Sequence, residues 1–241
     1  MGRSERTAPN SLINSRLKET SMTILRNTII HADCVKALPA LPDKTVDFIL
    51  TDPPYLVSYK PRDGRSVSND SDDSWLKPAF AEMYRVLAAD GYCLTFYGWP
   101  HADRFMQAFR AAGFRPVGHF AFPKPYSSSV GHVRCQHECA YLLAKGNPRA
   151  ASPLSDVVVW TENTGNKLHP TQKPTAILRP FIESYCPAEG TVLDSFAGSG
   201  STLVAAKRLG RSYIGIEIDA NCHSIATRRL AEFRETVASP A

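Results

Sequence analysis

The stretch TVLDSFAGSGSTLVAAKRLGRSYIGIEID, residues 191–219, decides the fold. Its apolar run at 191–196 predicts a strand, the segment 201–210 predicts a helix, and 213–219 predicts a second strand. Two strands that are joined through a helix lie parallel to one another in the same sheet. We therefore expect an α/β fold in which helices cover a mostly parallel sheet.

The same alternation of strand-like and helix-like segments extends over most of the chain. We expect strands at 27–33, 46–50, 92–98, 114–122 and 138–146, and helices at 34–38, 74–91, 101–113, 175–186 and 221–236. For the helix at 74–91, Ser74 suits an N-cap and Gly91 a C-terminal stop. Pro180 should kink the helix at 175–186. This order predicts a doubly wound sheet.

The composition is that of a globular protein rather than of a membrane or a disulfide-rich one. Of 241 residues, 43% are hydrophobic and 21% charged, and no apolar stretch is long enough to span a membrane. The six cysteines form no CxxC pair, which favours a reducing, intracellular setting. The formal charge of +5 permits nucleic-acid binding without requiring it.

The N-terminal segment is polar and contains no apolar core of a signal peptide. We expect residues 1–22 to be a disordered extension, and Met22 is an alternative start. The remainder, 23–241, is expected to form a single domain with short recognition loops at 56–73 and 147–168.

The segment LDSFAGSGST, residues 193–202, contains two glycines and lies between a predicted strand and a predicted helix. Glycine lets the backbone approach a ligand closely, and the acid Glu217 at the end of the next strand can hold ribose hydroxyls. The spacing is neither GxGxxG nor GxxxxGK[ST], which argues against NAD and ATP. The pattern therefore favours another adenosine-containing ligand.

The sequence TDPPY, residues 51–55, directly follows the predicted strand VDFIL. The two prolines end the strand pairing and stiffen the backbone. They leave Asp52 at the carboxyl end of the strand and Tyr55 just beyond it, where ligands bind in open α/β sheets. We expect this turn to present one acceptor side chain and one aromatic face to a ligand.

Four motifs, TDPPY, HPTQKP (169–174), DSFAGSG (194–200) and GIEID (215–219), together resemble the S-adenosylmethionine-dependent amino methyltransferases of DNA. Their order resembles that of the β group of N6-adenine and N4-cytosine enzymes, and the likeness covers 27–235. It implies a doubly wound, mostly parallel, seven-stranded Rossmann-like methyltransferase sheet with one antiparallel strand. It also implies S-adenosylmethionine as cofactor and double-stranded DNA as substrate.

The resemblance assigns the catalytic role to Asp52, Pro53, Pro54 and Tyr55. In the family this turn receives a base that has been flipped out of the helix. By resemblance, the Asp52 carboxylate and the Pro53 carbonyl accept the two hydrogens of the exocyclic amine, and Tyr55 stacks on the base. Methyl transfer is then direct, without a covalent enzyme intermediate.

The cofactor-binding residues that the resemblance implies are Asp33, Thr171, Lys173, Asp194, Phe196, Gly198, Ser199, Gly200 and Glu217. Phe196 and the glycine-rich segment would surround the methionine part, with Asp194 near its amino group. Lys173 would lie near the methionine carboxylate, or be a solvated charge. Asp33 would lie near the adenine amine, or cap the following helix. Asp219 is interpreted as a cap of the last helix.

The DNA-binding residues that we expect are Lys60, Arg62, Arg65, Phe122, Lys124 and Arg134. The first three lie in the 56–73 loop, which is equally consistent with a solvated loop. Arg134, with His137 and Glu138, matches a recurring Arg…His-Glu pattern of the family. A zinc site from His132, Cys135, His137 and Cys139 is the alternative for this region, although the spacing lacks a CxxC knuckle. No metal is expected.

The sequence thus predicts a methyltransferase that acts on N6 of adenine in DNA, because Asp rather than Ser begins the DPPY motif. The alternatives are an N4-cytosine enzyme, the same chemistry on RNA or a protein amide, and a non-catalytic DNA-binding protein. The short recognition loops suggest a short target sequence or a homodimer. No restriction-nuclease motif is found, and we expect a cytoplasmic, DNA-associated protein of a bacterium, phage or mobile element.

Overall fold

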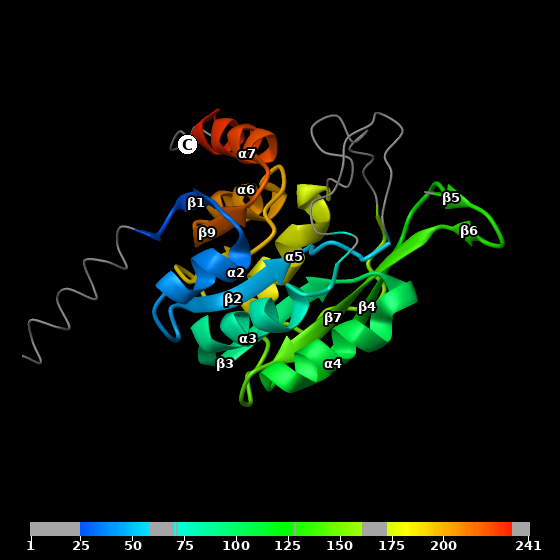
Figure 1. Ribbon diagram of the computed structural model, residues 1–241, viewed down its shortest axis with the longest axis horizontal. Coiled ribbons are helices and arrows are strands. Elements are labelled where there is room, and N and C mark those ends of the chain that lie inside the picture. The colour runs from blue at the N-terminus through cyan, green and yellow to red at the C-terminus, as the bar shows by residue number, and fades with distance from the viewer. Residues whose placement is uncertain (1–24, 58–69, 71, 128, 161–172, 233–241) are drawn as a thin grey trace, which may run out of the picture.

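The computed structural model describes residues 25–57, 70, 72–127, 129–160 and 173–232. Within them, helices flank a seven-stranded sheet of order β1-β9-β8-β2-β3-β7-β4 (Figure 1). Its strands are β1 (Thr28–His31), β2 (Val46–Thr51), β3 (Leu87–Phe96), β4 (Arg115–Pro123), β7 (His137–Ala144), β8 (Thr191–Asp194) and β9 (Ser212–Glu217). A small hairpin pairs β5 (Ser129–Val130) with β6 (Arg134–Cys135).

The helices are α2 (Cys34–Ala37), α3 (Leu76–Val86), α4 (Ala102–Ala112), α5 (Thr175–Tyr185), α6 (Ser201–Arg208) and α7 (Ala220–Glu232). Short 3-10 turns η1 (Leu38–Ala40) and η2 (Trp99–His101) precede β2 and α4. Helix α5 continues through Pro180. None of the helices in the described ranges combines the length and the apolar character needed to cross a bilayer.

The pairing confirms the predicted fold class. Strands β1, β9, β8, β2 and β3 pair in parallel, and β7 is antiparallel to both of its neighbours, β3 and β4. Because β7 runs against the rest, its first residues lie at the edge where the other strands end. This edge therefore collects the ends of most strands and the start of β7, and it contains the motifs singled out above.

The sheet separates two apolar layers, as the alternation of side chains along a strand requires. In β2, Phe48 and Leu50 belong to the layer beneath α5 and α6, and Ile49 belongs to the layer beneath α3 and α4. Phe181 of α5 and Phe80 of α3 are fully buried on these two sides. The inner strands β2 and β8 are buried on both faces, which explains their continuous apolar runs.

The prediction of a helix at 74–91 is wrong at both ends, because the helix spans Leu76–Val86. Ser74 does not cap it, because its backbone N–H and hydroxyl both donate to Asp72 and the helix begins at Leu76. The helix ends at Val86, and Leu87 already pairs with Val46 as the start of β3. Pairing with β2 therefore overrides the helical continuation up to Gly91.

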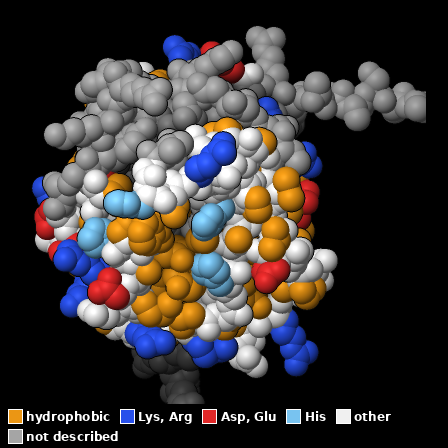
Figure 2. All heavy atoms as spheres, turned by 90° about the vertical axis from the view of Figure 1, so that its right-hand side faces the viewer, with side chains coloured by type: hydrophobic (Ala, Val, Ile, Leu, Met, Phe, Trp, Pro, Cys, Tyr) orange, Lys and Arg blue, Asp and Glu red, His pale blue; other side chains and the backbone are white. Residues whose placement is uncertain are grey.

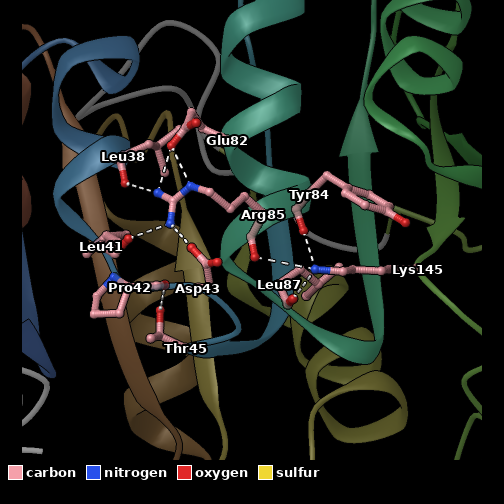
Figure 3. A network of polar contacts seen from close by, with 10 residues as sticks. All are labelled: Leu38, Leu41, Pro42, Asp43, Thr45, Glu82, Tyr84, Arg85, Leu87 and Lys145. Atoms are coloured by element: carbon pink, nitrogen blue, oxygen red, sulfur yellow. Dashed lines mark hydrogen bonds and ion pairs between the residues drawn. The ribbon is translucent and has the colours of Figure 1, made fainter. Parts of the chain in front are cut away.

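Side chains from other elements fix the C-terminal end of α3 (Figure 3). Lys145, just after β7, donates to the carbonyl oxygens of Tyr84 at 2.5 Å and of Leu87 at 2.6 Å. A cation there satisfies unpaired carbonyls and suits the negative end of the helix dipole. Arg85 points the other way, where it donates to the carbonyl oxygen of Leu38 and to the carboxylate of Asp43 (Figure 3). These contacts tie α3 to the segment that precedes β2.

Candidate active site

Acidic side chains follow or end four strands at the carboxyl edge of the sheet. Asp33 follows β1, Asp52 follows β2, Asp194 ends β8 and Glu217 ends β9. Since β9, β8 and β2 are neighbours in the sheet, the structure brings together acids that are far apart in the sequence. Carboxyl ends of parallel strands are the usual ligand-binding edge of such sheets.

The TDPPY turn lies against the end of β3. Tyr55 donates its hydroxyl hydrogen to Oδ1 of Asp52 at 2.8 Å. The turn passes so close to Gly98 that a Cβ atom there would lie 2.5 Å from the carbonyl oxygen of Tyr55. Glycine at 98 therefore permits the turn its position, and Pro53 and Pro54 carry the backbone from Asp52 to Tyr55.

A partly buried network of two lysines and two carboxylates lies beside this turn. Lys173, just before α5, forms an ion pair with Oδ2 of Asp52 and lies 3.0 Å from Oε2 of Glu138. Glu138, at the start of β7, is also 3.1 Å from Nζ of Lys124, which follows β4. The Tyr55 hydroxyl lies 3.4 Å from the same Oε2 of Glu138.

The network shifts the protonation of its members in different directions. Burial raises the pKa of Asp52, although Lys173 acts against this shift. Burial also opposes ionisation of Glu138, but the ammonium groups of Lys173 and Lys124 outweigh it and lower the pKa of Glu138. The two carboxylates raise the pKa of Lys173 against the effect of its burial. Lys173 is therefore a permanent buried cation between two acids of unequal strength.

A pocket opens beside Asp52 toward the glycine-rich turn. Its lining residues are Asp52, Lys173, Leu178, Asp194, Phe196, Ala197, Gly198, Ser199, Ser201 and Thr202. The Asp194 carboxylate accepts hydrogen bonds from Thr51 Oγ1 at 2.9 Å and from the Phe196 N–H at 3.1 Å. Burial nevertheless raises its pKa to about 7. The pocket thus contains a buried carboxyl group whose ionised form would be stabilised by a bound cation.

Glu217 and two glycines shape the glycine-rich turn. The carboxylate of Glu217 accepts from the N–H of Gly198 at 2.6 Å and from the N–H of Asp219 at 2.7 Å. Gly200 has a φ of 80°, and a Cβ atom there would lie 2.9 Å from the Cβ of Ala226 in α7. Glycine at 200 therefore allows both the left-handed turn and the close packing of α7 against it.

Arg229 of α7 holds the turn from the other side. Its guanidinium donates to the carbonyl oxygen of Ser199 at 2.5 Å and to the Ser199 hydroxyl at 3.2 Å. Burial lowers the pKa of Arg229, and the charge of Arg208 adds to the effect. The turn is therefore fixed by hydrogen bonds before any ligand arrives.

The two acids interpreted as possible helix caps both act as caps. Asp33 accepts from the N–H of Val35 at 2.9 Å at the start of α2. Asp219 accepts from the N–H of Cys222 at 2.8 Å at the start of α7, as predicted. The cap at Asp33 uses Oδ1. Its suggested place near an adenine amine stays a prediction.

The expected DNA-binding side chains are distributed differently. Arg134 is exposed on β6, but Phe122 is fully buried and packs on Phe96 with ring centroids 5.0 Å apart. Lys124 is also buried and pairs with Glu138. The structure therefore buries Phe122 in the core, and it joins Lys124 to the site through Glu138. Lys60, Arg62, Arg65 and the proposed cofactor ligand Thr171 lie outside the described residues, as do most of the 56–73 loop and residues 161–168 of the second loop.

Several residues of the site were not predicted from the sequence. Glu138 was noted only as part of a family pattern, and Leu178, Ala197, Ser201 and Thr202 of the pocket lining were not singled out. Ser201 and Thr202 could have been expected from their position directly after the glycine-rich turn. Within the described ranges, no cluster of three or more His, Cys, Asp or Glu residues is placed to hold a metal.

Comparison with known proteins identifies relatives in the same region of sequence. A family model described as DNA methylase, for N6 and N4 methyltransferases, matches residues 46–228. YubD of Escherichia coli (strain K12), whose assignment as a methylase is itself a prediction, is 51% identical over 203 residues. This match covers 84% of the chain and 89% of YubD.

A more distant sequence match and two solved structures of similar fold were also found. The type II methyltransferase M.HinfI of Haemophilus influenzae is 26% identical over 248 residues, which cover 86% of the chain and 69% of M.HinfI. The structure of M1.HpyAVI in complex with SAM has a TM-score of 0.67 at 23% identity, over 84% and 98% of the two chains. The cytosine-N4-specific PvuII DNA methyltransferase has a TM-score of 0.71 at 17% identity, over 88% of each chain. The fold is therefore common to all of these structures.

Proposed function

We propose that this chain, which belongs to the N6/N4 DNA methylase family, transfers a methyl group from S-adenosylmethionine to N6 of adenine in double-stranded DNA. The family is the one that the four motifs predict. The observation that supports the activity is a shared pocket. Asp52 of the TDPPY turn and Asp194 with the glycine-rich turn line one cavity, so donor and acceptor sites adjoin.

The pocket suits the cofactor. We propose that Asp194 binds the methionine amino group, that Phe196, Gly198, Ser199 and Gly200 surround the methionine part, and that Glu217 accepts from the ribose hydroxyls. Asp33 and Thr171 complete the proposed set. Lys173 also lines the pocket, but it is buried rather than a solvated charge, and its ammonium pairs with Asp52 and Glu138. S-adenosylmethionine supplies an electrophilic methyl group on a sulfonium when it is bound. The raised pKa of Asp194 fits an acid that a ligand cation stabilises.

The TDPPY turn activates the acceptor nitrogen. An exocyclic amine is a poor nucleophile because its lone pair is conjugated with the base. The Asp52 carboxylate and the Pro53 carbonyl accept its two hydrogens, which favours a pyramidal nitrogen with an available lone pair. Asp52 has a raised pKa and is a suitable acceptor for the proton that the nitrogen then loses. Base stacking on Tyr55 contributes about 1–3 kcal/mol.

Adenine is proposed over cytosine because Asp52 stands where N4-cytosine enzymes of the family more often carry Ser. The DNA backbone would be held by Lys60, Arg62, Arg65 and Arg134, inside the cell, where the substrate is found.

A homodimer is part of this proposal. The right-hand face of Figure 1, seen in Figure 2, gathers hydrophobic side chains around histidines, with Lys and Arg at its border. Trp99 is 73% exposed and Val117, on the edge strand β4, is 40% exposed.

The deciding experiment is methyl transfer from labelled S-adenosylmethionine to unmethylated genomic DNA, followed by nucleoside mass spectrometry. We expect labelled N6-methyldeoxyadenosine, and no label with Asp52→Ala, whose cofactor affinity should stay within about twofold of wild type. Labelled N4-methylcytosine would refute the base assignment. No label in DNA with an enzyme that binds the cofactor would refute the activity. Sedimentation of wild type and Trp99→Lys tests the dimer.

A further inference from the structure

The Lys173 ammonium lies between two carboxylates that are not equivalent in the proposed reaction. It pairs with Oδ2 of Asp52, which receives the base, and with Oε2 of Glu138 at 3.0 Å. Lys173 is 5% exposed, and its Nζ lies 5.6 Å from the centroid of the Tyr55 ring and 4.6 Å from that of Phe96. A buried cation therefore lies at the aromatic surface on which the base would stack.

This arrangement conflicts with base binding as long as Lys173 stays on Asp52. Oδ1 of Asp52 already accepts from the Tyr55 hydroxyl, and Oδ2 accepts from Lys173. A carboxylate oxygen can accept more than one hydrogen bond, but an incoming amine finds both oxygens engaged and would share Asp52 with the Lys173 ammonium. An ammonium left beside the amine would also oppose the positive charge that grows on nitrogen during methyl transfer, because like charges repel strongly in a buried site.

Glu138 is positioned to remain the ion-pair partner of Lys173 when Lys173 leaves Asp52. Its Oε1 is held by Lys124 at 3.1 Å, and the pairing of Glu138 with Phe122 fixes the backbone beneath it. Lys124 is in turn held near the ring of Trp160, 5.8 Å from the ring centroid. The pKa of Glu138 is lowered, which keeps its carboxylate ionised, whereas the pKa of Asp52 is raised.

We propose that Glu138 is a positioning residue of the methyl transfer: it retains Lys173 when the base amine takes over Asp52. The inference rests on the proposed function and adds a residue to it. Because Lys173 already contacts both acids, the exchange requires only that one of two existing contacts is given up. The amine then replaces the ammonium as the donor to Asp52, and the charge of Lys173 stays neutralised.

The test measures entry of the natural adenine into the site. A duplex with the target sequence, mapped by the methylation experiment above, carries 2-aminopurine next to the target adenine, where fluorescence rises as adenine leaves the stack. Wild type, Glu138→Gln and the double variant Glu138→Gln/Lys173→Met are compared at saturating non-reactive cofactor analogue. Glu183→Gln, on the exposed surface of α5, is the matched control. Melting curves establish that each variant is folded.

We expect Glu138→Gln to lower the equilibrium constant for movement of adenine out of the stack by about tenfold. The KM for DNA should rise. Cofactor affinity should not change, and the double variant should recover base entry. Base entry in Glu138→Gln equal to that of Glu183→Gln would overturn the inference, as would a loss that removal of Lys173 does not reverse. Methylation by wild type in parallel samples, with S-adenosylmethionine in place of the analogue, tests the proposed function separately. If the product were N4-methylcytosine, only the base assignment would fail, and the comparison would be repeated with target cytosine.

Discussion

The proposed role of Asp194 predicts that the affinity for cofactor depends on pH in a range where carboxylates usually do not titrate. Its pKa is raised to about 7 by burial, against hydrogen bonds from Thr202, Phe196 and Thr51. If Asp194 binds the methionine ammonium, only its ionised form is productive. The ionised fraction falls from about three quarters at about pH 7.5 to about a tenth at about pH 6. Productive binding should fall by about eightfold over this range.

The assay is the dissociation constant of S-adenosylmethionine, measured calorimetrically at both pH values for wild type and Asp194→Asn. Asparagine keeps an acceptor oxygen for Thr51 and Phe196 but does not titrate. Dividing one affinity by the other removes titration of the ligand itself. We expect the ratio of wild-type to variant affinity to rise by about eightfold from about pH 6 to about pH 7.5. A ratio that does not change with pH would refute the pairing of Asp194 with the ammonium.

The same shift has a consequence for the ligand-free protein, and its sign is opposite to that of a salt-bridged acid. The folded pKa of Asp194 lies above the ordinary value of 3.8, so the folded state binds the proton more tightly. The free energy of unfolding should therefore fall as pH rises from about 4 to about 7, by on the order of 4 kcal/mol. This loss should be absent from Asp194→Asn, and denaturant unfolding at about pH 4 and about pH 8 measures it.

Three further substitutions test the remaining elements of the site and its support. Glu217→Gln keeps one acceptor but removes the charge that holds the Gly198 N–H, so the cofactor Kd from calorimetry should rise by about tenfold; an unchanged Kd would exclude Glu217 from the site. Gly200→Ala introduces a Cβ 2.9 Å from that of Ala226 at a φ of 80° and should cost about 1–3 kcal/mol in urea unfolding, unless the turn relaxes. Lys145→Met leaves the carbonyls at the end of α3 without their donor and should cost about 1–3 kcal/mol with kcat unchanged, whereas a lower kcat would show that α3 transmits strain to the site.

The sequence was sufficient for the parts of the fold that depend on local chemistry. Each buried strand of the parallel region has a continuous apolar run, and the glycine-rich turn has to be glycine because of φ at Gly200 and its contact with Ala226. The end of α3 was not predictable in this way. Leu87 carries no local stop signal, and the helix ends there because pairing with Val46 gives Leu87 a place in the sheet. Tertiary pairing decided this boundary.

The charged network of the site illustrates why residues distant in sequence were missed. Periodicity places Glu138 at the start of a strand but does not give the direction of that strand. Only because β7 is antiparallel does its first residue reach the edge at which β2 ends, so that Glu138 shares Lys173 with Asp52. Likewise, Lys124 is a surface residue by composition and becomes a buried cation because β4 ends beside β7. The reversed strand thus supplies the second carboxylate of the network, and with it a partner for Lys173 other than Asp52, the residue proposed to receive the base.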